Sequence, residues 1–357
     1  MKRFLVNFLC ACVPSKKIRH RIKDYFSISK GKNEKTALID DGFMPILGVL
    51  SMGDQQLLQE YFLTHNMPEK INILKAGLDE TSQKNIDRYL FRMLLLPDNK
   101  ISANYKINKI FFESLKTEEE KECTRKFIQE YLQYKKDIVL FKEEYNVDTF
   151  YFHHGLRFQS KELKKYIAGK DFIDAGAYVG DSALILNKYY APSHIWSFEI
   201  SEHNRKTYQQ VAKLNNLPEN KYTLVPMGVS DTKKTIYIDD SGHQGTTTLL
   251  SGGTKCELTD LDSFVEENNL KVGFIKSDVE GSGLEALKGM KKTIRKDKPV
   301  LCLAIYHNLR EFFDTKPMLE EIVGGEYKMI ITQLHSFLEY QVEIVIFAYP
   351  KELDSAK

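Results

Sequence analysis

The sequence has few cysteines, little net charge and no long apolar run, and each shortage excludes a class of protein. The five cysteines (Cys10, Cys12, Cys123, Cys256 and Cys302) are scattered and form no CxxC pair. This excludes a disulfide scaffold and a structural zinc site, and it favours a reducing, cytoplasmic location. The formal net charge is only +2 over 357 residues, so nucleic acid is not an expected partner.

The apolar N-terminal stretch from Phe4 to Val13 is about 10 residues long, whereas a membrane-spanning helix takes about 20. It has the charged start of a signal peptide but a poor cleavage pattern. A basic segment follows, in which Ile18 and Ile22 share one helical face. Residues 1–35 therefore have two interpretations. One is a peripheral anchor on the cytoplasmic membrane surface, and the other is an ordinary docking helix with a solvated basic side.

The length predicts two domains after this segment, because one core seldom organises so long a chain. Residues 36–147 show apolar residues at helical spacing, most clearly at 55–61, 84–96 and 114–145. We predict a mostly helical N-terminal domain there, and it carries no catalytic constellation. Residues 148–357 alternate short apolar strands with helices, which is typical of an α/β domain with a parallel sheet.

The expected strands of this second domain begin at Asp171 and continue at 194–200, 222–229, 235–238, 272–278, 299–307, 327–338 and 341–349. Residues 241–254, rich in glycine and threonine, are expected to form a flexible loop. The last two strands lie a short turn apart and should pair antiparallel. A mainly parallel, seven-stranded sheet with an antiparallel last strand is the Class I methyltransferase-like, or Rossmann-like, arrangement.

The segment from Asp171 to Ser182 stands at the centre of this domain. An apolar strand leads into it, capping residues lead out of it, and Gly176 and Gly180 lie between. Gly176 lets the backbone turn sharply and lets a ligand approach closely. We expect the turn to offer backbone N–H groups at a helix N-terminus, where anionic ligand groups bind. No G-x-G-x-x-G is present, so the dinucleotide fingerprint fails.

Ligands of an open α/β sheet bind outside the carboxyl ends of the strands, and acidic residues gather at the expected ends here. These ends carry Asp174, Glu199, Ser230, Asp231, Asp278, Glu280 and His307. Such a rim repels phosphate-rich ligands and favours a cationic ligand with hydroxyls and amines, as S-adenosylmethionine is. Glu199 stands where an acid accepts hydrogen bonds from a ribose diol. The competing interpretation of each acid is a helix cap or a surface ion pair.

Asp278 and Glu280 should face one side if their strand extends through residue 280, because alternate residues of a strand point the same way. Neighbouring acids raise each other's pKa and so supply a general base. The pair would also suit a divalent cation, although we predict no metal. His307 is a further candidate base. His153 and His154, on the loop before the first strand, are candidates for substrate contact, although a lone histidine is more often structural.

At these positions the sequence resembles the FkbM family of S-adenosylmethionine-dependent methyltransferases. The matching segments are 172–182, 198–199, 228–231, 259–264, 275–281 and 305–307, within roughly residues 150–350. The resemblance implies a Class I methyltransferase fold and O-methylation, often of a carbohydrate or a natural product. In one respect the sequence departs from the family, which often has asparagine where Tyr178 stands.

The resemblance also implies which residues surround the cofactor. It places Asp174, Gly176 and Gly180 around the methionine part, with Ala177 and Tyr178 in the same turn. It places Glu199 on the ribose, Ser230 and Asp231 near the adenine, and Asp278 and Glu280 beside the transferred methyl group.

We therefore predict an enzyme that methylates a sugar hydroxyl in a surface glycan or its precursor. The glycan rests on analogy, since bacterial enzymes that build surface glycans have a similar basic, apolar N-terminus. The alternatives are a methyltransferase acting on a small metabolite or a lipid-linked intermediate, and a non-catalytic module that binds the cofactor. The expected partner is a carbohydrate or small molecule, and the oligomeric state is left open.

Overall fold

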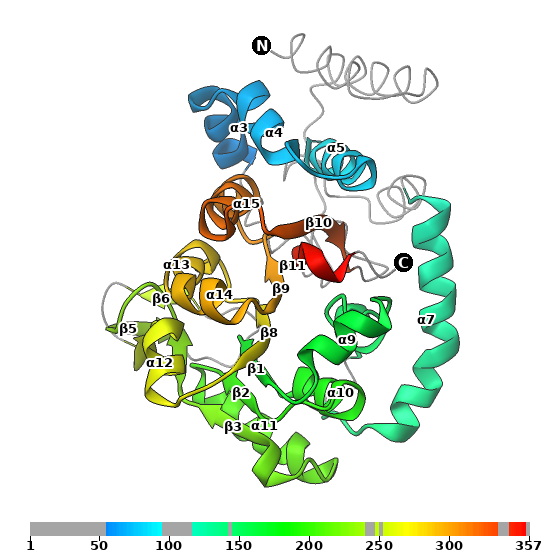
Figure 1. The fold of residues 1–357 in the computed structure, drawn as a ribbon, viewed down its shortest axis with the longest axis vertical. Coiled ribbons are helices and arrows are strands. Elements are labelled where there is room, and N and C mark those ends of the chain that lie inside the picture. The colour runs from blue at the N-terminus through cyan, green and yellow to red at the C-terminus, as the bar shows by residue number, and fades with distance from the viewer. Residues whose placement is uncertain are drawn as a thin grey trace, which may run out of the picture.

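The computed structural model describes residues 55–94, 116–141, 145–239, 247–249, 253–334 and 343–354. The predicted membrane anchor within residues 1–35 lies outside these ranges. Within them, no helix combines the length and the apolar character needed to cross a membrane. A central sheet with helices on both faces dominates the molecule (Figure 1).

The central sheet has seven strands in the order β10-β11-β9-β8-β1-β2-β3. Parallel pairing joins β1 (Asp171–Ala175), β2 (Ile195–Phe198), β3 (Tyr222–Val225), β8 (Val272–Ser277) and β9 (Val300–Ala304). β11 (Ile344–Pro350) runs antiparallel to both β9 and β10 (Tyr327–Gln333). The predicted mainly parallel sheet with an antiparallel strand near its end is confirmed.

Helices cover both faces of the sheet (Figure 1). One layer contains α12 (Leu261–Glu267), α13 (Gly283–Lys288), α14 (Lys291–Asp297) and α15 (Leu309–Val323). The other contains α9 (Lys161–Ile167), α10 (Asp181–Tyr190) and α11 (Glu202–Leu214). Side chains fix where helices start: Ser201 Oγ accepts from the N–H of Asn204 at 3.1 Å at the start of α11.

The N-terminal helices pack directly on this domain. They are α3 (Gln55–Thr64), α4 (Met67–Lys75), α5 (Glu80–Leu94), α7 (Glu118–Asp137) and α8 (Val147–Phe150). α4 lies on α15 and α5 on β10 (Figure 1). Arg92, only 1% exposed, donates to both carboxylate oxygens of Glu120 at 2.8 and 2.7 Å and to Gln333 of β10 at 3.5 Å. The helices before residue 148 thus share buried apolar cores with the sheet.

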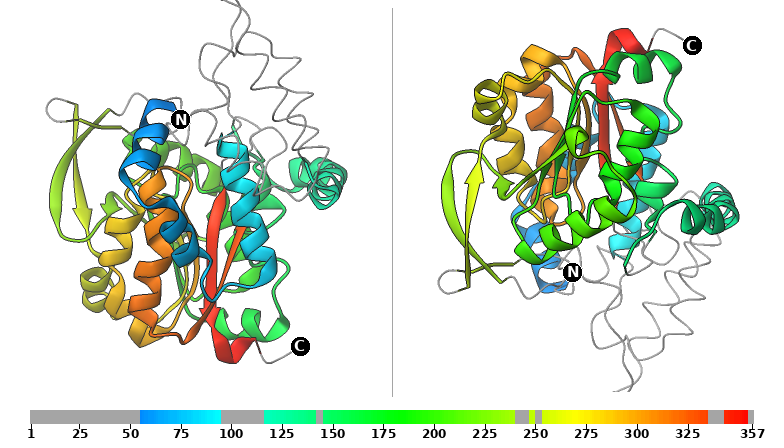
Figure 2. Two further views of the ribbon diagram at one scale, coloured as in Figure 1. Left: turned by 90° about the horizontal axis from the view of Figure 1, so that it is seen from above. Right: turned by 90° about the horizontal axis from the view of Figure 1, so that it is seen from below.

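The prediction of one continuous strand over residues 222–229 is wrong. This segment divides at Pro226, which cannot donate a ladder hydrogen bond, into β3 and β4 (Met227–Val229). β4 belongs to a second sheet of order β4-β7-β5-β6, with β5 (Lys234–Asp239), β6 (Thr247–Leu249) and β7 (Thr254–Thr259). Figure 2 shows its strands projecting from the body. β6 and the start of β7 fall where a flexible loop was expected.

Candidate functional site

The glycine turn after β1 is packed tightly against its neighbours. Gly176 and Gly180 have φ values of +81° and +83°, a backbone conformation that favours glycine. A Cβ atom at Gly176 would lie 1.8 Å from the carbonyl oxygen of Asp278, and one at Gly180 would lie 2.7 Å from the ring of Tyr208. Close packing on the end of β8 and on α11 therefore requires both glycines. The sharp turn expected at Gly176 is confirmed, and its close contact is with the end of β8.

The N–H groups of the turn bond within the chain. Those of Gly176 and Ala177 donate to the carbonyl of Phe198 at 3.0 and 2.9 Å, and that of Gly180 donates to Ala177 at 2.9 Å. The N–H of Tyr178 donates to the carboxylate of Glu199 at 2.8 Å. The expectation that the turn offers these N–H groups to an anionic ligand group is wrong for these four. The helix that follows begins at residue 181 without a side-chain cap.

Glu199, at the end of β2, is 7% exposed, and burial raises its pKa. Its carboxylate accepts from the N–H groups of Tyr178 and Ser201, each at 2.8 Å, and from the side chain of Asn204. A carboxylate has about four acceptor positions. Glu199 is therefore held firmly by the chain and keeps about one position for a hydroxyl of a ligand.

A buried lysine, Lys276 of β8, lies beside the turn. Its Nζ donates to the carbonyl of Gly176 at 2.6 Å and lies 3.3 Å from Oδ1 of Asp174, a fully buried residue. Burial raises the pKa of Asp174. Burial works against the charge of Lys276, but the carboxylates of Asp174, Asp278 and Asp181 outweigh it and raise the lysine pKa. Lys276 therefore stays cationic and fixes the position of the turn.

His307 joins three carboxylates. Its Nε2 lies 3.0 Å from Asp278 Oδ1 and 3.5 Å from Glu280 Oε2, and its Nδ1 lies 3.3 Å from Glu311 Oε2. Burial lowers the pKa of His307, but hydrogen bonding to Asp278 and Glu311 outweighs this and raises that pKa to about 10. The ring is therefore an imidazolium at neutral pH. Burial raises the pKa of Asp278, but the bond to His307 dominates and the net pKa is lowered.

Glu280 differs from its neighbours in being accessible. β8 ends at Ser277, so Asp278 and Glu280 lie on a loop rather than on the expected strand, and Glu280 has a φ of +49°. His307 nevertheless brings their carboxylates together. The side chain of Glu280 is 47% exposed. Partial burial and the charge of Asp278 raise its pKa, which makes it the more basic carboxylate of the pair.

Four residues of this cluster were not expected from the sequence: Lys276, Tyr306, Glu311 and Glu343. The hydroxyl of Tyr306 lies 3.1 Å from Asp278 and 3.3 Å from Glu343, and its one proton can go to either carboxylate. Glu311 stands four residues after His307 at the start of α15, a spacing that signals helical neighbours. Glu343 precedes β11, and only the sheet order brings it here, so the sequence holds no signal for it.

Ser230 and Asp231, the two predicted adenine contacts, lie between β4 and β5 of the second sheet. They follow β4 of the second sheet, where the N–H of Ser230 donates to Thr259 at 2.9 Å. The carboxylate of Asp231 accepts from Lys234 at 2.8 Å, and this bond lowers its pKa to about 2. The carboxylate of Asp231 also accepts from the hydroxyls of Ser230 and Thr232, so its partners among the described residues are local ones.

The adjacent histidines, His153 and His154, are both buried and both have positive φ. Nδ1 of His153 lies 2.8 Å from the hydroxyl of Tyr190 at the last residue of α10. Nε2 of His154 lies 2.9 Å from Ser182 Oγ at the opposite end of that helix. Burial lowers their pKa values to about 4 and about 3, so both rings are neutral. Of these two histidines, only His154 contacts the end of α10 that follows the glycine turn.

The described residues suit a cationic, donor-rich ligand. The carboxylates around Lys276 and His307 outnumber these two cations. Oδ1 of Asp174 lies 3.3 Å from Lys276 Nζ, and Oδ2 of this buried carboxylate accepts no hydrogen bond from the described residues. Buried oxygens of this kind need donors, which the ammonium and hydroxyl groups of S-adenosylmethionine would provide. Among the described residues, no three histidine, cysteine or acidic side chains are arranged to hold a metal ion.

Comparison with known proteins assigns this region. Residues 174–341 match the family model described as the methyltransferase FkbM domain. A comparison with curated proteins finds no match. Among solved structures, methyltransferase FkbM from Methylobacillus flagellatus KT is similar with a TM-score of 0.52 and 19% identity, over 80% of this chain and 59% of that one. The chain thus spans less than two thirds of that structure.

Two further structures are similar over 53% of this chain. An rRNA methylase from Streptococcus thermophilus has a TM-score of 0.33 and 13% identity, and the match covers 92% of it. Precorrin-6y C5,15-methyltransferase from Geobacter metallireducens GS-15 has a TM-score of 0.33 and 12% identity, and the match covers 84% of it.

Proposed function

The chain carries an FkbM-family methyltransferase domain at residues 174–341, and from this premise we propose that it transfers a methyl group from S-adenosylmethionine to a sugar hydroxyl. The acceptor is a surface glycan or its precursor. One observation carries the proposal: His307 gathers Asp278 and Glu280 at the carboxyl ends of β8 and β9, where ligands of such sheets bind.

Glu199, Asp174 and Asp278 are the residues that would hold the cofactor. The remaining acceptor position of Glu199 suits a ribose hydroxyl, and the buried carboxylates of the other two suit an ammonium. When bound, S-adenosylmethionine supplies an electrophilic methyl group on a sulfonium. Ser230 and Asp231 stay predictions as adenine contacts.

Glu280 is the general base of this proposal. A sugar hydroxyl is barely ionised at neutral pH, so a positioned base contributes about 10²–10⁴-fold to the rate. His307 is already protonated, and the lowered pKa of Asp278 makes that carboxylate a weak base. Glu280 combines exposure with a raised pKa, so it accepts the hydroxyl proton while the imidazolium of His307 holds it in place.

Two measurements test the proposal. Calorimetric titration with S-adenosylmethionine should show saturable binding to the purified full chain. Incubation with a panel of neutral oligosaccharides should then release S-adenosylhomocysteine, and mass spectrometry should find one added methyl group on the acceptor oxygen. Binding without turnover on the panel, but with turnover on small metabolites, would replace the sugar acceptor. Absence of cofactor binding would refute the methyltransferase itself.

A further inference from the structure

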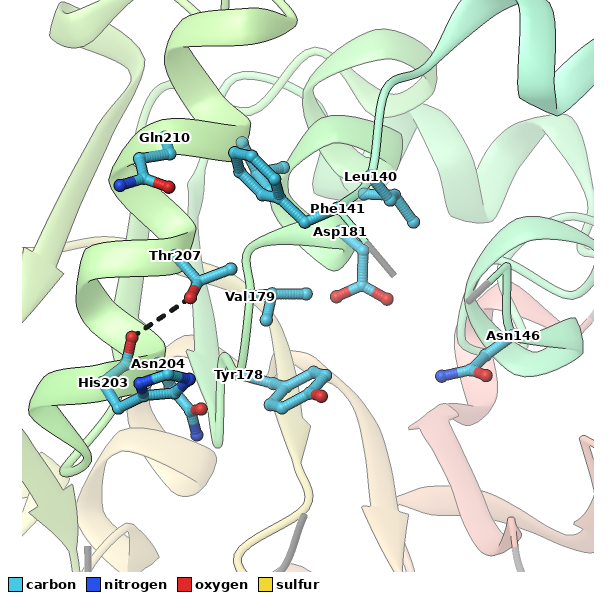
Figure 3. A pocket seen from close by; sticks show the side chains of 11 residues that line it. Leu140, Phe141, Asn146, Tyr178, Val179, Asp181, His203, Asn204, Thr207 and Gln210 are labelled. Atoms are coloured by element: carbon cyan, nitrogen blue, oxygen red, sulfur yellow. Dashed lines mark hydrogen bonds between the residues drawn. The ribbon is translucent and has the colours of Figure 1, made fainter. Parts of the chain in front are cut away.

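A cavity with polar and apolar walls lies on the α11 side of the glycine turn. Its volume is about 210 Å³. The turn and the start of α10 contribute Tyr178 and Asp181, α11 contributes Asn204 and Gln210, and the segment between α7 and α8 contributes Phe141 and Asn146 (Figure 3). Three parts of the chain that are distant in sequence therefore build its walls.

Buried polar groups line this cavity. Asp181 is 6% exposed and Asn204 is 7% exposed. The carboxylate of Asp181 points toward the side where Tyr178 and Asn146 lie (Figure 3). The carboxylate of Asp181 accepts from backbone N–H groups at the start of α10, and the amide of Asn204 donates to Glu199. Each side chain keeps further hydrogen-bonding positions, and a hydroxyl can both donate to a carboxylate and accept from an amide.

The charge of the cavity selects a neutral ligand. Among the described residues that line it there is no lysine or arginine, and His203 is the one basic side chain, so a phosphate or carboxylate group would find no permanently charged partner. An amine is not favoured either, because the nearby Lys276 already opposes the charge of the one carboxylate, Asp181. The ligand that this lining favours is therefore a neutral group rich in hydroxyls.

We propose that this cavity binds one neutral sugar ring. The amides of Asn146, Asn204 and Gln210 and the carboxylate of Asp181 would bond its hydroxyls, and the rings of Tyr178 and Phe141 would cover its C–H face. The volume is below the roughly 300–1,000 Å³ typical of sites for drug-sized ligands, which matches a single ring. This inference rests on the proposed function, because it takes the acceptor to be a sugar, and it adds a binding site for one ring of that acceptor.

The order of the strands places the proposed sugar ring of the cavity apart from the hydroxyl that would be methylated beside Glu280. β8 and β2 are the two neighbours of β1. Gly176 packs on Asp278 after β8, whereas residues 178–181 face α11, the helix after β2. The cavity and Glu280 therefore lie on opposite sides of the turn. The acceptor then contains at least two sugar units, one held in the cavity and another presented to Glu280.

Saturation-transfer NMR on the full chain tests the site, with methyl glycosides of glucose, galactose, mannose and N-acetylglucosamine as probes. At least one should bind, and saturating S-adenosylhomocysteine should not displace it. Gln210→Leu should weaken that binding about fivefold, the effect of one hydrogen bond. Its neighbour Gln209 is also exposed on α11 but is not among the residues that line the cavity, so Gln209→Leu should leave binding unchanged.

Three results would overturn the inference: no probe binds, S-adenosylhomocysteine displaces every probe, or the two glutamine variants behave alike. Each of these three results can be told apart from a failure of the proposed function. Sugar binding without methyl transfer to any acceptor would keep this cavity and remove the function. Methyl transfer to a sugar with Gln210→Leu kinetics equal to those of Gln209→Leu would keep the function and remove the cavity.

Discussion

Replacing Glu280 with glutamine isolates the proposed proton transfer from everything else in the site. Glutamine keeps the size of the side chain but cannot take a proton from a hydroxyl. The residue is 47% exposed and contacts His307 only at 3.5 Å, so the substitution should leave the fold intact. The affinity for S-adenosylmethionine should also stay unchanged, because the proposed cofactor contacts lie on other residues.

The expected loss in kcat is about 10²–10⁴-fold, the usual contribution of a general base. This corresponds to about 3–5 kcal/mol in activation free energy. The loss should not be complete, because the remaining residues still position both substrates. Released S-adenosylhomocysteine measures kcat, and calorimetry measures cofactor affinity on the same preparation.

The pH profile gives a second readout. The pKa of Glu280 is raised above its ordinary value, so kcat/KM should rise with pH as this carboxylate loses its proton. It should fall again as His307 deprotonates near pH 10, because Asp278 and Glu280 then lose their counter-charge. In Glu280→Gln the rising limb should disappear while the falling limb remains.

Glu285→Gln provides the matched control, since Glu285 lies on the next helix, α13, and is not among the ion-pair partners of His307. It should keep wild-type turnover. Turnover in Glu280→Gln within threefold of the control, with an unaltered rising limb, would remove Glu280 from the base role.

The remaining predictions concern cofactor binding and stability. Glu199→Ala should weaken S-adenosylmethionine binding by about 1–3 kcal/mol and lower Tm, because two backbone N–H groups also lose their acceptor; unchanged calorimetric affinity would assign the ribose to another group. Gly176→Ala should lower both Tm and cofactor affinity, since its Cβ would collide with backbone; a fully active variant contradicts this. Arg92→Leu should reduce the free energy of unfolding in urea by about 3 kcal/mol, because the largely buried carboxylate of Glu120 loses both hydrogen bonds from its close cation and keeps as a cation only Arg88 at 3.8 Å. Lys84→Ala, in an exposed pair, should leave this free energy almost unchanged. The stability that His307 contributes is fully present below about pH 6.5 and lost as pH rises through about 10, so the Tm of His307→Gln should vary less than that of wild type between pH 7 and 10.

Local sequence patterns were enough to predict the strand, glycine turn and helix around Gly176. An apolar strand, two spaced glycines and a helix start follow one another within 171–182, and each signal acts over a few residues. The last two strands were predicted for the same reason, because a short connection leaves only antiparallel pairing. The convergence of Asp278, Glu280 and His307 followed from strand ends meeting at one edge of a sheet.

What the sequence could not provide depends on contacts between distant segments. The division of 222–229 at Pro226 sends the chain into a second sheet whose other strands lie up to 30 residues further on. Asp231 therefore follows a strand of the second sheet, where its carboxylate forms an ion pair with Lys234. Likewise, the acid–base character of His307 is set by Glu311 and Asp278 together, and a histidine met alone in a sequence gives no indication of its pKa.

The hydrogen bonds from Arg92 to Glu120 and to Gln333 have a consequence for how proteins of this architecture can exchange segments. Because α5 and α7 are tied to each other and to β10 through one buried guanidinium, the helical half cannot be exchanged between relatives as a free module. A hybrid that joins residues 1–147 to a foreign second half would need a matching glutamine on the recipient's β10. Exchange of segments should therefore succeed only where Arg92, Glu120 and Gln333 come from the same parent.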